Sequence, residues 1–144
     1  MVPFRSVVGH LLDSARGGGF ARIGIYYFHD IPEEVVFCEP WLGDPVPLEA
    51  ACEPYRGAGL LIVSDGGAAR GNRDAERVEK TVAAIEALRR FSPHLAWLNP
   101  MPPSRWTRSS AGSIQVMGRI PMFPLDRAGL DRAVDVLRGR RRAA

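Results

Sequence analysis

Apolar residues recur along this chain in two alternating patterns, and the alternation predicts a layered fold of helices and strands. Stripes at helical spacing predict helices over residues 5–16, 48–55, 75–91 and 109–115, and a last one after Asp126. Short apolar runs predict strands over residues 21–28, 34–38, 60–64, 95–98 and 118–123. Elements in this order are typical of an α/β fold with a mostly parallel sheet flanked by helices. The 144 residues contain no repeat and no linker, so we expect a single domain over residues 1–144.

Polar residues and prolines mark the limits of several of these elements. Asp74 and Asp126 precede two of the helical stripes and are expected to cap them. Pro121 has no N–H to donate, which predicts that the last strand lies at a sheet edge. The turn at residues 29–32 predicts an antiparallel hairpin between the first two strands. Residues 40–47, which contain three prolines, predict a loop.

The strongest indication of a site is the apolar run over residues 60–63, which ends on Ser64, Asp65 and two glycines. Four consecutive large aliphatic residues predict a strand buried on both faces, as in the middle of a parallel sheet. Open α/β sheets bind ligands at the carboxyl ends of their strands, and glycines let the backbone turn sharply there. Asp65 is therefore a candidate metal ligand, with the simpler alternative that its carboxylate accepts backbone N–H groups in a turn.

Composition and charge narrow the function classes. The chain is 46% hydrophobic and 24% charged with a formal net charge of +3, which is ordinary for a globular protein. The arginines gather only at the C-terminus (residues 138–142), so we expect a solvated tail and not a nucleic-acid arm. No apolar run approaches the roughly 20 residues that cross a membrane, and no signal peptide is recognised. Cys38 and Cys52 lack further ligands at metal spacing, which favours buried thiols in a reducing, cytoplasmic compartment.

Three other candidate chemistries carry less weight. Ser64 with His29 or His94 does not form the G-x-S-x-G pattern of a hydrolase, so we do not expect an enzyme of that kind. The basic, glycine-rich loop over residues 66–73 precedes a helix and leaves a small nucleotide- or phosphate-binding α/β enzyme as the alternative function. The tryptophans, Trp41, Trp97 and Trp106, are expected to pack in the core or at its edge and not to stack on bases. Trp106, in a polar, arginine-flanked loop, is the one that we consider as an anchor for a partner.

Three segments share their residue pattern with one family. They are LLIVSDGGAARG (60–71), ALRRFSPHLAWLNPMP (87–102) and MFPLDRAGLDRAVDVLRGR (122–140). With these segments the chain resembles a von Willebrand factor type A (VWA) domain, more narrowly the bacterial CoxE-like branch, over essentially its whole length. The resemblance implies a three-layer, Rossmann-like α/β domain that binds other proteins. It also implies a partner, a MoxR-type AAA+ ATPase, in complex maturation or in the insertion of metal cofactors.

The resemblance implies a metal-dependent adhesion site that is incomplete in this chain. Family members hold the ion, Mg²⁺ or Mn²⁺, with a D-x-S-x-S segment, a threonine in a second loop and an Asp after the fourth strand. Asp65 matches the third element, and its neighbours Ser64 and Gly66 become candidate interaction residues. The second loop corresponds to Asp44 to Leu48 and contains no threonine. The D-x-S-x-S segment is absent, so we expect a metal only if that loop is supplied.

The same comparison predicts a sheet without its opening central strand. In the family this strand lies between those that correspond here to residues 21–28 and 60–64. Without it, we expect unpaired N–H and C=O groups on both neighbours, or direct pairing between them, and a weak or homo-oligomeric fold. Two explanations stay open: a start upstream of Met1, or a degenerate domain that has lost its metal loop.

Overall fold

A computed structural model describes residues 24, 26–28, 31, 35–38, 43–67 and 74–139. The helix expected over residues 5–16 and most of the strand expected over residues 21–28 lie outside this part of the chain. The strands are β1 (Val35–Phe37), β2 (Pro45–Pro47), β3 (Leu60–Val63), β4 (Leu95–Asn99) and β5 (Met122–Pro124). The helices are α2 (Leu48–Cys52), α3 (Ala75–Arg89), α4 (Ser110–Met117) and α5 (Arg127–Leu137), with short 3₁₀ turns η1 (Glu53–Tyr55) and η3 (Pro103–Arg105).

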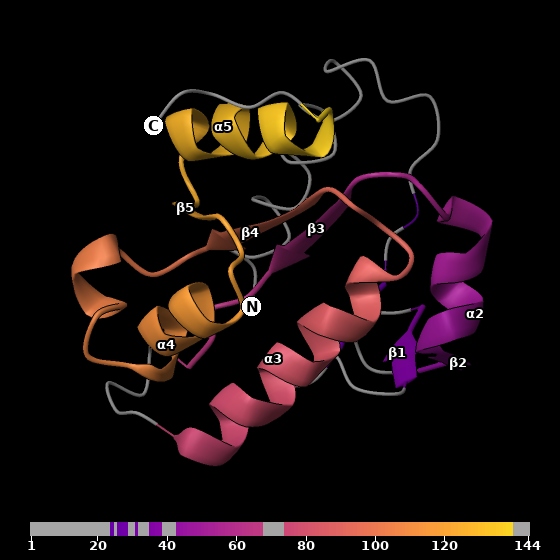
Figure 1. Cartoon of the computed structure of the whole chain (residues 1–144), viewed down its shortest axis with the longest axis horizontal. Helices are drawn as coiled ribbons and strands as arrows, with labels where there is room; N and C mark the ends of the chain where they lie inside the picture. Colours follow the sequence, from indigo (N-terminus) through magenta and orange to yellow (C-terminus); the bar gives the residue numbers. More distant parts are fainter. Residues whose placement is uncertain are drawn as a thin grey trace.

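The centre of the fold is a parallel sheet of three strands in the order β3-β4-β5 (Figure 1). β4 is the middle strand, and all five of its residues are buried. Among the described strands β5 lies at the sheet edge, as Pro121 predicts. The α/β class and the parallel sheet flanked by helices are therefore confirmed.

Helices cover the two faces of this sheet (Figure 1). α3 and α4 pack on one face, where Ile85 and Ile114 join Trp97 in the larger core cluster. α5 packs on the other, where Ala133 meets Ala96 and Leu98 of β4. Successive residues of a strand point to opposite faces, which is why β4 contributes to both clusters.

The predicted caps are confirmed. The Asp74 carboxylate accepts the N–H of Arg77 at 3.1 Å, and that of Asp126 accepts the N–H of Gly129 at 2.7 Å. α4 begins after Ser109, whose hydroxyl accepts the N–H of Ala111. Each cap satisfies one of the N–H groups that the first turn of a helix leaves without a partner.

The loop predicted over residues 40–47 is partly wrong, because β2 pairs antiparallel with β1 there. Val46 lies opposite Val36. On the other side of β1, the backbone groups of Tyr27 and Phe37 form two hydrogen bonds with each other. Because Phe37 bonds to Tyr27, Val36 must direct its backbone groups to β2, where it forms a hydrogen-bonded pair with Val46. The backbone of the prolines on either side of Val46 then points away from β1, so no hydrogen bond between the two strands needs the N–H that proline lacks. The bridge between Tyr27 and Phe37 agrees with the predicted antiparallel hairpin.

Two further expectations need correction. Cys38 is exposed at the end of β1 and is not a buried thiol, whereas Cys52 is half-buried in α2. β3 has the apolar pattern of a central strand, yet within the described residues it lies at the edge of its sheet. This position agrees with the unpaired backbone groups that the resemblance leads us to expect on the strand over residues 60–64.

Candidate functional site

The carboxyl end of β3 is a tight turn in which each polar side chain is bonded to the backbone. The hydroxyl of Ser64 accepts the N–H of Gly66 at 3.2 Å, and the carboxylate of Asp65 accepts the N–H of Gly67 at 3.0 Å. Both glycines have positive φ, 59° and 86°, a conformation that residues with a Cβ rarely adopt. The structure thus brings Ser64, Asp65 and Gly66 together, in the turn that was the simpler interpretation of Asp65.

Two side chains of the middle strand hold this turn in position. The indole N–H of Trp97 donates to the carbonyl of Ser64 at 2.7 Å, and the amide of Asn99 donates to the carbonyl of Asp65 at 2.9 Å. The amide oxygen of Asn99 accepts the N–H of Met101 at 2.9 Å, so one buried side chain joins the loops that follow β3 and β4. The sequence analysis missed Asn99; the available signal was a polar residue at the end of a fully apolar strand.

The turn also packs closely on the beginning of α4. A Cβ added at Gly66 would lie 3.3 Å from the Cβ of Ala111, and one at Gly67 would lie 3.3 Å from the Cβ of Ser110. The hydroxyl of Ser110 accepts the N–H of Asp74 at 2.8 Å and so links α4 to the start of α3. The carboxyl end of β3 is thereby held between two helix N-termini.

The described residues do not assemble a metal centre around Asp65. No three His, Cys, Asp or Glu side chains in the part of the chain that the structure describes lie close enough to hold an ion together. The second loop of the resembling family, Asp44 to Leu48, contributes β2, which pairs with β1 and not with the sheet that bears Asp65. The residues present therefore offer one carboxylate, already used by a backbone N–H, and do not fit a dedicated Mg²⁺ site.

Trp106 lies in the core, with 6% of its surface exposed. Its indole N–H donates to the carbonyl of Met101 at 2.7 Å, which ties it to the loop that Asn99 also holds. A role for Trp106 as an anchor stays a prediction, and the side chain would have to leave this contact to meet a partner.

The outer edge of β3 is the described feature that differs most from an ordinary α/β sheet. Leu60 donates its N–H to the carbonyl of His94, just before β4, and Ser64 donates to Leu98 of β4. The register gives Ile62 the same direction. The backbone N–H and C=O groups of Leu61 and Val63 therefore point away from β4. Neither residue forms an outward backbone hydrogen bond with any residue that the structure describes. Such an edge is a template for a further strand.

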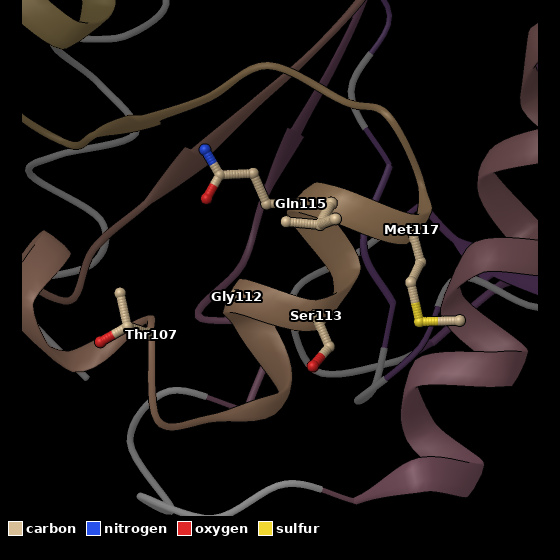
Figure 2. A pocket seen from close by; sticks show the side chains of 6 residues that line it. Thr107, Gly112, Ser113, Gln115 and Met117 are labelled. Atoms are coloured by element: carbon tan, nitrogen blue, oxygen red, sulfur yellow. The ribbon is translucent and has the colours of Figure 1, made fainter.

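A second surface feature lies on α4. A shallow hollow of about 350 Å³ lies there (Figure 2), lined by Thr107, Gly112, Ser113, Gln115, Val116 and Met117. Val116 is 76% exposed and Met117 is 62% exposed. The lining carries no charged group, so the hollow offers apolar contact and no evident chemistry.

Comparisons with protein-family models, with curated proteins and with solved structures found no match for this chain. Each helix in the described part of the chain is too short or too polar to span a lipid bilayer.

Proposed function

We propose that this chain is a protein-interaction domain, of the VWA-like kind that its sequence resembles, and that it has no catalytic role. The observation that supports this proposal is the outer edge of β3, where Leu61 and Val63 direct their backbone groups away from the sheet. Only an extended polypeptide backbone offers donors and acceptors at the spacing of such an edge. A small-molecule substrate does not.

The chemistry of the turn after β3 supports the same proposal. The side chains of Ser64 and Asp65 accept backbone N–H groups, and their carbonyls accept side chains from β4. These bonds make the turn a rigid support for the end of β3, and they give the Ser64 hydroxyl and the Asp65 carboxylate a structural role. The partner that the resemblance implies is a MoxR-type AAA+ ATPase.

The test is the binding of a purified MoxR-type ATPase from the same organism to the full chain, with two variants at one position. Val63→Pro removes an N–H that points outward and leaves the ladder to β4 intact. Val63→Ala keeps that N–H and shortens the side chain. We expect Val63→Pro to weaken binding at least about tenfold relative to Val63→Ala. Equal binding by the two variants, with both folded by circular dichroism, would overturn the proposal.

Calorimetry separates the remaining alternatives. Heat from ATP in the absence of a protein partner would favour the phosphate-binding enzyme over an interaction domain. Heat from Mg²⁺ or Mn²⁺ that disappears in Asp65→Asn would assign a metal to Asp65. If Asp65 only forms the turn, Asp65→Asn stays as stable as the parent, because an amide oxygen also accepts the N–H of Gly67.

A further inference from the structure

We propose that the outer edge of β3 pairs with the same edge of a second copy of this chain. The two strands would run antiparallel about a twofold axis that passes at Ile62, and three strands from each copy would form one continuous sheet. This inference rests on the proposed function, because it names an occupant for the same edge.

The hydrogen-bonding groups of the edge are self-complementary. With Ile62 opposite Ile62 of the second copy, Leu61 lies opposite Val63, and Val63 lies opposite Leu61. Both residues point their N–H and C=O groups outward, so each of these two pairs exchanges two hydrogen bonds. All outward groups of Leu61 and Val63 are then satisfied by one symmetric operation.

The side chains of β3 restrict the strand that can pair with it. Leu60 and Ile62 belong to the core cluster under α3 and α4, and Leu61 and Val63 pack in the cluster under α5. An added strand must therefore be apolar on both faces. β3 itself has this composition, and no charged residue lies between Arg56 and Asp65. In the symmetric register Asp65 lies opposite Gly59, so no like charges oppose each other across the pair.

The other described strand edges carry proline at outward positions, whereas the outer edge of β3 does not. At the opposite edge of the sheet, Pro124 of β5 has no N–H to direct outward, and its carbonyl accepts the N–H of Asp126. Met122 is the one residue of this short strand that directs both backbone groups outward. In the hairpin, the outward positions of β2 are Pro45 and Pro47. β3 contains no proline, no lysine and no charged residue, which are the devices that usually block edge pairing.

The test is sedimentation equilibrium of the full chain from about 1 to about 300 µM, a range that covers weak dimers. We expect the mass to rise from 15.8 kDa towards twice that value, 31.6 kDa. Val63→Ala should still dimerise, because the outward N–H remains. Val63→Pro should raise the dissociation constant at least about tenfold over Val63→Ala. Amide hydrogen exchange at Leu61 and Val63 should slow with concentration in the parent, while exchange at Val116 stays unchanged.

Three outcomes would overturn this inference. The chain could remain monomeric throughout the range, the two Val63 variants could dimerise equally, or the amides of Leu61 and Val63 could exchange at the same rate at every concentration. Binding of the ATPase distinguishes the two proposals. If the chain is monomeric but Val63→Pro, unlike Val63→Ala, no longer binds the ATPase, the proposed dimer is wrong and the proposed interaction domain is supported. If Val63→Pro changes neither dimerisation nor binding of the ATPase, both proposals are wrong.

Discussion

Replacing Asn99 by leucine tests whether the buried amide holds the turn after β3. Asn99 is fully buried and forms two hydrogen bonds of 2.9 Å, to the carbonyl of Asp65 and from the N–H of Met101. Leucine has the same branched shape, so the substitution leaves these two backbone groups without partners. Its larger volume adds to this loss. Each unpartnered group costs about 1–3 kcal/mol when fully buried. Both residues are half-buried and water reaches them in part, so we expect a total loss near the lower limit, about 2–3 kcal/mol.

The assay is urea unfolding followed by far-ultraviolet circular dichroism, with a thermal melt beside it. For a chain of this size the expected loss lowers the melting temperature by about 6–12 °C. A loss below about 0.5 kcal/mol would refute the reasoning, because surface substitutions without buried partners commonly fall in that range.

Asn99→Asp provides the matched control, because the size of its stability loss depends on pH. The aspartate keeps an acceptor for Met101 but turns an oxygen towards the carbonyl of Asp65. Burial and this contact favour the neutral acid, so the pKa of the new carboxyl in the folded state rises above its unfolded value. The deficit of this variant is then largest at neutral pH and shrinks as the pH falls through the raised pKa. Asn99→Leu has no such group, so its deficit relative to the parent should not change with pH.

Two further predictions concern other parts of the fold. Gly129→Ala in α5 places a Cβ 1.8 Å from the carbonyl oxygen of Pro124, so the clash should outweigh the helix propensity gain of about 1 kcal/mol and lower stability by about 2–3 kcal/mol. Ala128→Gly, exposed in the same helix, should cost only about 1 kcal/mol in the same melts, and an equal loss in both would contradict the clash. Cys38 is exposed, whereas burial raises the pKa of the Cys52 thiol. Cys52 should react at least about tenfold more slowly with a disulfide reagent at neutral pH, and equal rates would show that it is as accessible as Cys38.

The parts of the fold that could be predicted depend on neighbours in sequence. Asp74 and Asp126 were identified because a cap and the helix that it begins lie within three residues of each other. The strands around Ile62 and Trp97 were identified because each is a short apolar run. Such signals are local, so they survive without knowledge of the rest of the chain.

The parts that could not be predicted depend on partners far apart in sequence. Pro45 and Pro47 suggest a loop until the direction of each backbone group is known, because a proline is tolerated where its position faces outward. Asn99 gives no signal of the carbonyl that it holds, which lies 34 residues earlier. The edge position of β3 was expected only from the resemblance, which lacks the strand beside it, and not from the strand's own residues. An apolar run records burial on its two faces and does not record which strand lies beside it.

The difference between the two edges of the parallel sheet also limits how far it can grow. Pro124 lacks a donor at the β5 edge, while Leu61 and Val63 at the β3 edge have no outward backbone partner among the described residues. A chain with two bare edges can pass strand pairing from copy to copy and extend into a fibre. In a chain with one unpaired edge, the first pairing occupies that edge. The assembly then ends at the β5 edge of each copy, which bears proline. In the proposed dimer, the polymer that an unprotected apolar strand would otherwise start ends after a single pairing.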